Sequence, residues 1–154
     1  MLTTDMTSCC WQMGEPFTQF LDSFVRSASF QYSRVCFPLK TPLLLYVEED
    51  EINLTYTQER WLLIGRDYID ATGRTDGYFI RYTEDQARRK TLIGDYPDSE
   101  TVVQLVFEYL DDDKWYVTDA YNDCYYSGVR TLTDMEEARR RIAEENRRFI
   151  SLYP

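Results

Sequence analysis

The feature that most constrains the fold of this chain is a strand–turn–strand pattern that runs from Val102 to Tyr121. Apolar and polar residues alternate along 101–110, three aspartates interrupt the alternation at 111–113, and it resumes along 114–121. Because successive side chains of a strand point to opposite faces of a sheet, this pattern predicts an antiparallel hairpin with one buried face. The residues expected on that face are Val103, Leu105, Phe107 and Tyr109, followed on the returning strand by Trp115, Val117, Asp119 and Tyr121.

The same period of two predicts strands elsewhere in the chain. The acidic run at 48–51 separates two alternating segments and is expected to form an exposed hairpin tip. Pro38 marks an edge strand or the end of a strand, since proline cannot donate to a sheet ladder. The predicted strands are 34–39, 42–47, 51–57 and 77–83. Turns or loops are expected at 29–33, 67–76 and 94–100, a short polar helix or turn is expected at 84–90, and 58–65 fits a helical turn or a strand equally well.

Helices are predicted near both ends of the chain. From Glu15, apolar residues recur at spacings of three and four as far as Ala28, and Pro16 suits the first helical position. Near the C-terminus, Thr133 and Glu136 have the spacing of a capping box, in which each side chain satisfies the other residue's free backbone N–H.

These elements predict one α+β domain over residues 15–154, preceded by a flexible segment at 1–14. A chain of 154 residues is long enough to bury a substantial core without disulfide bonds. The expected architecture is a curved, mostly antiparallel sheet packed on the N-terminal helix, with the C-terminal helix closing the structure.

The charge balance and the hydropathy pattern exclude two classes of partner. Seventeen basic and 27 acidic residues give a net charge of −10, so the chain has no excess of cations with which to bind nucleic acid. No run approaches the roughly 18 apolar residues of a transmembrane helix. The start of the sequence also lacks the basic and apolar regions of a secretory signal peptide.

The absence of histidine excludes histidine-based catalysis and histidine metal ligands. The four cysteines form no C-x-x-C pair, so we expect neither a metal site nor a cofactor. Vicinal Cys9 and Cys10 are poor disulfide partners. Cys36 and Cys124 are expected to be buried free thiols, with a disulfide between them as the alternative.

Two resemblances follow from local motifs. The segment Lys114-Trp115-Tyr116-Val117-Thr118-Asp119 is similar to the final hairpin of nuclear-transport-factor-like cone domains, a superfamily that includes ketosteroid isomerases. The motif Phe17-x-x-Phe-Leu-x-x-Phe, the segment 30–39, and the Trp61 and Trp115 regions together resemble a gut-bacterial domain family of unknown function with a cystatin-like, cone-shaped fold. The second resemblance spans residues 16–153 and implies a periplasmic or cell-surface location, because members of that family are usually predicted to be secreted or lipid-anchored.

The cone resemblance implies a pocket between the concave face of the sheet and the N-terminal helix. Asp119 and Tyr121 are then expected to point towards its mouth, and Arg34, Tyr46 and Tyr82 to join them from neighbouring strands. A carboxylate beside a phenol in an apolar pocket can abstract a proton next to a carbonyl, with the phenol holding the oxyanion. Alternatively, Asp119 pairs with Arg34 or caps a turn, and Tyr121 packs in the core.

Three functional hypotheses remain open. The first is a non-catalytic binding module, which the family resemblance would place at the cell envelope, and whose aromatic pocket takes a small apolar or carbohydrate-like ligand or is simply filled. The second is a cofactor-free isomerase or dehydratase using Asp119 and Tyr121. The third is an acidic inhibitor or immunity-type protein that binds a basic partner through 48–51 and 111–113. A homodimer is compatible with each of them.

Overall fold

The computed structural model describes residues 14–97 and 102–154, so all but Gly14 of the predicted flexible segment, with Cys9 and Cys10, lies outside the described residues. The N-terminal half contains α2 (Phe17–Phe24), α3 (Ala28–Ser33), β1 (Leu43–Val47), β2 (Asp50–Leu54) and two short 3₁₀ turns, η1 (Gln58–Arg60) and η2 (Arg66–Tyr68). The C-terminal half contains β3 (Phe79–Asp85), β4 (Arg89–Asp95), β5 (Val102–Tyr109), β6 (Trp115–Asn122) and α4 (Leu132–Leu152).

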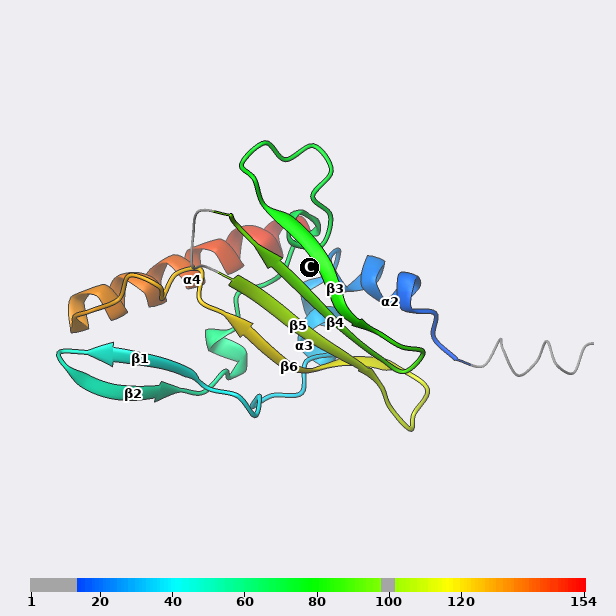
Figure 1. Cartoon of the computed structure of the whole chain (residues 1–154), viewed down its shortest axis with the longest axis horizontal. Helices are drawn as coiled ribbons and strands as arrows, with labels where there is room; N and C mark the ends of the chain where they lie inside the picture. The colour runs from blue at the N-terminus through cyan, green and yellow to red at the C-terminus, as the bar shows by residue number, and fades with distance from the viewer. Residues whose placement is uncertain (1–13, 98–101) are drawn as a thin grey trace, which may run out of the picture.

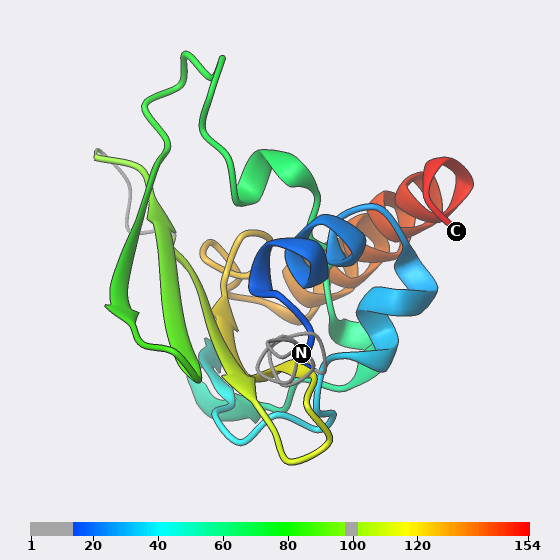
Figure 2. The same ribbon diagram turned by 90° about the vertical axis from the view of Figure 1, so that its right-hand side faces the viewer.

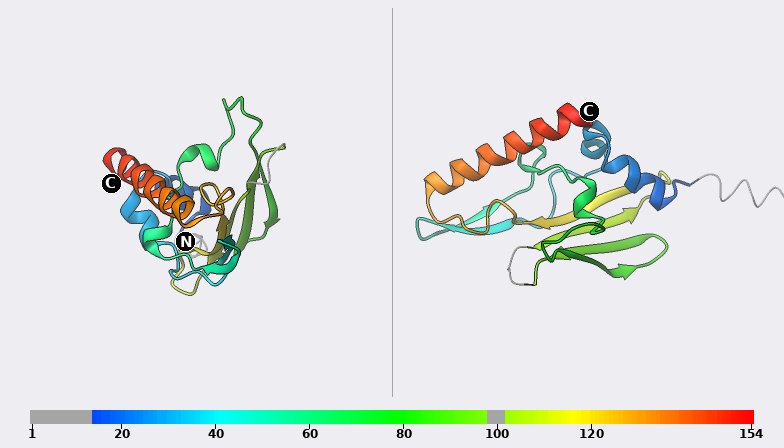
Figure 3. Two further views of the ribbon diagram at one scale, coloured as in Figure 1. Left: turned by 90° about the vertical axis from the view of Figure 1, so that its left-hand side faces the viewer. Right: turned by 90° about the horizontal axis from the view of Figure 1, so that it is seen from above.

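Strands β3 to β6 form an antiparallel four-stranded sheet in sequence order, and β1 and β2 form a separate hairpin (Figure 1). Helices α2, α3 and α4 lie on one side of the larger sheet (Figure 2). Helix α4 runs from the tip of the β1–β2 hairpin to the start of α3 (Figure 3), where Ala28 N–H donates to the Tyr153 carbonyl at 2.8 Å. This arrangement confirms the predicted α+β fold.

Aromatic rings fill the space between α2 and the sheet. The Phe20 and Phe24 rings are fully buried and lie 5.9 and 6.3 Å from the Phe107 ring, both edge-on. The Phe17 ring makes edge-on contacts of 5.2 Å with Phe107 and 4.9 Å with Trp115. Edge-to-face rings at these distances are favourable contacts. The part of the cone in which the resemblance implied a pocket is therefore occupied by side chains of the core.

A bulge in β6 changes which residues face the core. Neighbouring Val106 and Phe107 on β5 pair with Asp119 and Val117 on β6, so Thr118 is an extra residue in the ladder. An extra residue reverses the alternation of every side chain beyond it.

The prediction that Asp119 and Tyr121 share the inward face of Trp115 and Val117 is therefore wrong. Beyond the bulge the buried residues are Ala120 and Asn122, while Asp119 and Tyr121 are partly exposed on the opposite face of the sheet.

Strand β4 begins within the predicted short helix or turn at 84–90 and ends within the predicted loop at 94–100. Its outward face carries charge: Arg89 Nε donates to Glu84 on β3 at 2.8 Å, and Arg89 Nη1 lies 3.2 Å from Glu108 on β5. On its inward face Gly94 has no side chain and is covered by the ring of Tyr78. Because charged residues lie on one face of β4 and a glycine on the other, its sequence does not show the apolar–polar alternation that predicts a strand.

Two shorter segments also differ from expectation. Residues 29–33 belong to α3, a helix that Ser27 caps by accepting a hydrogen bond from Phe30 N–H at 3.2 Å. The predicted edge strand at 34–39 contributes only a parallel bridge between Val35 and Val117. Cys36 and Cys124 are free thiols, but Cys36 is exposed rather than buried, and Cys124 is half-buried.

Residues 61–64 are held by two buried side-chain amides. Gln31 Nε2 donates to the Phe24 and Ile64 carbonyls at 2.7 and 3.0 Å, and Gln31 Oε1 accepts from Trp61 Nε1 and Ile64 N–H at 2.9 and 2.7 Å. From the other side, the Asn146 side chain of α4 donates to the Trp61 carbonyl at 2.7 Å and accepts from Leu63 N–H at 2.9 Å. The two side-chain amides thus bind backbone groups of this segment that a neighbouring strand would otherwise bind.

Helix α4 begins at Leu132, with the capping box formed by Thr131 and Asp134 rather than by the predicted Thr133 and Glu136. Both pairs have the required spacing, but the earlier start is supported from outside the helix. The carboxylate of Glu48, at the tip of the β1–β2 hairpin, accepts a hydrogen bond from Leu132 N–H at 3.2 Å.

Replacing Thr131 with alanine is expected to lower the free energy of unfolding by about 1 kcal/mol, the usual effect of losing a helix cap. Thr133→Ala, two residues on and exposed, is the matched control and should change it by less than about 0.5 kcal/mol. Urea denaturation followed by circular dichroism measures both. A larger loss for Thr133→Ala would contradict the observed start of the helix.

Candidate functional site

A groove of about 330 Å³ runs between β1 and the end of β6. We call it the β1–β6 groove. A volume of this size is within the range of small-molecule sites. The residues that line it are Leu43, Leu44, Leu45, Tyr46, Tyr121, Asp123, Tyr126, Ser127, Val129 and Arg130.

Strand β1 supplies one wall of the groove because its side chains alternate. Leu43 and Leu45 are buried in the core, whereas Leu44 and Tyr46 lie on the exposed face. The Tyr46 ring is 56% exposed, and its hydroxyl lies 3.5 Å from a carboxylate oxygen of Glu51 on β2. Tyr46 therefore offers a solvent-facing ring with one polar contact at its tip.

Tyr121 faces the groove as a consequence of the β6 bulge. Its hydroxyl donates to Asp123 Oδ2 at 3.5 Å. Burial raises the pKa of Tyr121, and the neighbouring Asp123 carboxylate raises it further, so the phenol stays protonated at neutral pH. Its one proton is directed at Asp123, and its oxygen can accept a further hydrogen bond.

The end of the groove that β6 and the following loop form is held by hydrogen bonds to the backbone. Tyr56 is buried beneath β6, where its hydroxyl donates to the Asn122 carbonyl at 2.7 Å and accepts from Asn122 N–H at 2.9 Å. The Arg130 guanidinium lies at the rim and donates to the Val129 carbonyl at 2.9 Å. Its other N–H groups give this end a cationic donor.

Asp119 lies outside the groove. Its carboxylate accepts from Thr41 Oγ1 at 2.6 Å, from Thr41 N–H at 3.3 Å and from Ala120 N–H at 3.0 Å. It thus ties the segment before β1 to β6, a structural role close to the turn-capping alternative. Asp119 and Tyr121 have separate hydrogen-bond partners and do not form a pair.

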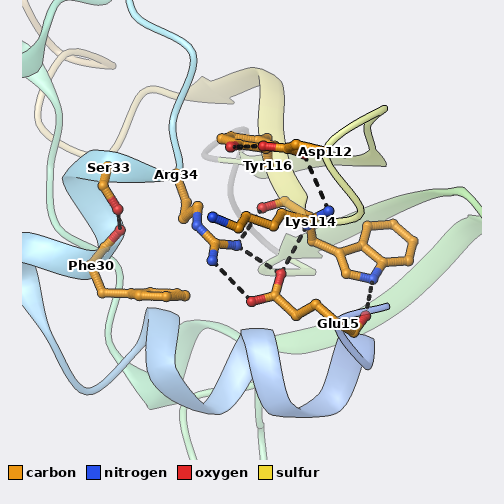
Figure 4. A network of polar contacts seen from close by, with 8 residues as sticks. Glu15, Phe30, Ser33, Arg34, Asp112, Lys114 and Tyr116 are labelled. Carbon is orange, nitrogen blue, oxygen red and sulfur yellow. Dashed lines mark hydrogen bonds and ion pairs between the residues drawn. The ribbon is translucent and has the colours of Figure 1, made fainter. Parts of the chain in front are cut away.

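Arg34 belongs to a structural network at the start of α2 (Figure 4). Its guanidinium forms a bidentate pair with Glu15, with nitrogen–oxygen distances of 2.7 and 3.0 Å, and donates to the Trp115 carbonyl at 3.0 Å. It also stacks 4.5 Å from the centre of the Phe30 ring. Its partner is Glu15 rather than Asp119, and these contacts leave Arg34 away from the groove.

Tyr82 lies on β3, far along the sheet from the groove, and its ring makes an edge contact of 6.4 Å with Phe17. The structure thus brings Tyr46 and Tyr121 together and leaves Arg34, Tyr82 and Asp119 elsewhere. Sequence reasoning missed Asp123, Tyr126 and Arg130 as groove residues. The only sequence signal for them is the unusual density of tyrosine at 121–126.

The two acidic tips do not form one surface. Figure 1 shows the β1–β2 tip and the β5–β6 turn at opposite ends of the long axis. Glu48 also bonds to the start of α4, and Asp112 Oδ1 accepts from Lys114 N–H at 3.2 Å. No helix in the described part of the chain is long and apolar enough to cross a membrane.

Comparison with solved structures identifies the family. A family model matches residues 15–150. A cystatin-like protein from Bacteroides caccae is 32% identical over 93% of this chain and 98% of its own, with a TM-score of 0.81. The chain belongs to this cystatin-like family. This confirms the resemblance to a gut-bacterial family that the sequence motifs indicated.

Two further solved structures are similar to the chain over nearly its whole length. A protein from Bacteroides uniformis is 38% identical over 92% of this chain and 98% of its own, with a TM-score of 0.78. One from Bacteroides ovatus is 35% identical over 93% and 96%, with a TM-score of 0.75. No curated protein sequence shows significant similarity to the chain. Family membership establishes the fold, and the function has to be inferred from the groove itself.

Proposed function

We propose that this protein is a non-catalytic binding module whose β1–β6 groove takes a carbohydrate-like ligand. The observation that carries the proposal is the placement of two tyrosine rings, Tyr46 and Tyr121, with Asp123 and Arg130 in a single groove. Aromatic rings with a few fixed polar groups are the usual lining of a small-molecule site.

The choice of a carbohydrate over a purely apolar ligand rests on the polar groups. The C–H faces of a sugar ring can lie on an exposed tyrosine ring, while its hydroxyls need donors and acceptors at the edge. The Arg130 guanidinium is a donor, and the Tyr121 hydroxyl oxygen, the Asp123 carboxylate and the Ser127 hydroxyl can accept. A purely apolar ligand would leave these groups without compensation for lost water.

The other two hypotheses have less support. The isomerase hypothesis needs Asp119 and Tyr121 to act on one substrate in an apolar pocket, but they have separate partners and the interior of the cone is filled by rings such as Phe107. The acidic-inhibitor hypothesis gains nothing from two acidic tips at opposite ends of the molecule (Figure 1).

The test is isothermal titration calorimetry with a panel of neutral tri- to hexasaccharides of glucose, xylose, mannose and galactose. We expect one of them to bind, and Tyr46→Ala to weaken its affinity by about tenfold, the loss of about 1.4 kcal/mol of ring contact. Tyr46 is exposed, so its replacement should leave the fold intact. Tyr121→Phe, which keeps the ring and removes the hydroxyl, should weaken binding by about threefold to tenfold.

Tyr82→Ala is the matched control, because Tyr82 is another exposed strand tyrosine and lies outside the groove. It should leave the affinity within about twofold of the wild type. The proposal fails if no saccharide in the panel binds at millimolar concentration, or if Tyr82→Ala weakens binding as much as Tyr46→Ala.

A further inference from the structure

A second cavity, of about 440 Å³, lies between the C-terminal half of α4 and the segment from Leu62 to Tyr68. We call it the α4 pocket. The groove described above shares none of its lining residues, which are Leu62, Leu63, Gly65, Arg66, Asp67, Tyr68, Tyr125, Glu145, Arg148, Phe149, Leu152 and Tyr153.

The floor of the α4 pocket is rigid. It is formed by the segment that Gln31 and Asn146 hold from opposite sides through buried amide hydrogen bonds. Next to this segment, Gly65 leaves the floor open, because a Cβ there would lie 3.0 Å from the Asp67 carboxylate and 3.8 Å from the Phe149 ring. A floor fixed in advance lowers the entropy lost on binding.

The walls of the pocket are aromatic. The Phe149 and Tyr153 rings lie 5.3 Å apart on α4 and its C-terminal end. Tyr153 is held in place because its carbonyl accepts from Ala28 N–H of α3. On the opposite wall the half-buried Tyr68 ring packs edge-on against Tyr78 at 6.1 Å. The walls can therefore take a flat apolar body.

The rim carries two arginines. Arg66 uses Nη2 in an ion pair with Asp22 at 2.7 Å, and Arg148 uses Nη1 in an ion pair with Glu145 at 2.6 Å. A guanidinium has five N–H donors, so each arginine can bind a further anion while keeping its present partner. Asp67 and Glu145 also line the pocket, so its charged residues balance, and the groups available to an anion are the guanidinium N–H groups that the ion pairs leave free.

We infer that the α4 pocket binds a small organic anion with a flat aromatic body. The rings of Tyr68, Phe149 and Tyr153 hold the body, and Arg66 and Arg148 bind the anionic group at the rim. This site is independent of the carbohydrate-like ligand proposed for the β1–β6 groove.

Anilinonaphthalene sulfonate, a fluorescent aromatic anion, is the probe. Titrated into the folded wild-type protein, it should bind saturably at one site. Leu152 and Leu132 are matched exposed leucines of α4, 66% and 63% exposed, and only Leu152 lines the pocket. Leu152→Asp should weaken binding by about tenfold or more, and Leu132→Asp should leave it within about twofold.

A second pair of variants tests the charge of the rim. Arg148→Gln should weaken binding by about fivefold, whereas Arg140→Gln, which alters another ion-paired arginine of α4 outside the pocket, should not. Neutral N-phenylnaphthylamine should bind more weakly than the sulfonate. The inference is overturned if binding is not saturable, or if Leu132→Asp and Leu152→Asp weaken the affinity for the probe equally. It is also overturned if Tyr46→Ala, in the β1–β6 groove, weakens binding of the probe.

Discussion

Replacing Gln31 with leucine is expected to lower the free energy of unfolding by about 4 kcal/mol, a large part of the roughly 5 to 15 kcal/mol that stabilises a typical domain. The substitution removes four hydrogen bonds at a fully buried position. It leaves carbonyls of Phe24 and Ile64 and the indole N–H of Trp61 without partners. Each buried neutral group left unsatisfied costs about 1 to 3 kcal/mol, so several together outweigh the gain from a larger apolar side chain.

The control for Gln31 is Gln19→Leu, which makes the same substitution at an exposed position of α2. It should change the free energy of unfolding by less than about 0.5 kcal/mol. Urea denaturation followed by tryptophan fluorescence measures both variants, and Trp61 is one of the three tryptophans that contribute to the signal. If Gln31→Leu lowers the free energy of unfolding by less than about 1 kcal/mol, the hydrogen bonds of Gln31 to residues 61–64 do not contribute the stability that their geometry indicates.

Replacing Arg34 with methionine is expected to lower the free energy of unfolding by about 3 kcal/mol. The methionine keeps most of the apolar stem but leaves the Glu15 carboxylate, whose side chain is only 17% exposed, without its cation. Glu15 Oε1 also accepts from Trp115 N–H at 2.9 Å, so the loss extends to the start of β6. Thermal denaturation monitored by circular dichroism should show the corresponding fall in Tm.

Arg26→Met is the matched control for Arg34. Arg26 pairs with Asp22 at 3.1 Å, but the two side chains are 63% and 49% exposed, so solvent screens the pair. Its loss should cost less than about 0.5 kcal/mol. The double variant Glu15→Gln with Arg34→Met should be less destabilised than the sum of the single variants. Strict additivity would show that the two residues do not act as a pair.

The sequence predicted the elements whose patterns are local. The hairpin of β5 and β6, the β1–β2 hairpin and the amphipathic stripes of α2 and α4 were all visible as periods of two or of three and four. In these elements the residues that specify the local structure are the same residues that face the core, so pattern and packing agree.

The β6 bulge could not be predicted from the same pattern. Thr118 fits an uninterrupted strand as well as a bulged one, because the choice depends on which residues of β5 lie opposite. That single extra residue turned Asp119 and Tyr121 to the outer face. Tyr121 therefore remains a candidate in a groove, whereas the pairing of Asp119 with Tyr121 that the isomerase hypothesis required is not formed.

The segment at 61–64 was ambiguous for a different reason. It is neither a helix nor a ladder strand, and its backbone is satisfied by Gln31 and Asn146, which lie far away in the sequence. No local pattern records such long-range side-chain contacts. The same holds for Arg34, whose partner Glu15 is 19 positions earlier and is brought near only by packing of α2 on the sheet.

The central claim, that the β1–β6 groove is the ligand site, is tested most directly by nuclear magnetic resonance. Backbone amide shifts of the labelled protein would be followed while the tightest-binding saccharide of the panel is added. We predict that the shifted amides cluster at the residues that line the groove, which are 43–46, Tyr121, Asp123, Tyr126, Ser127, Val129 and Arg130. Amide shifts that cluster elsewhere, on the outer face of β3 or around the α4 pocket, would contradict it.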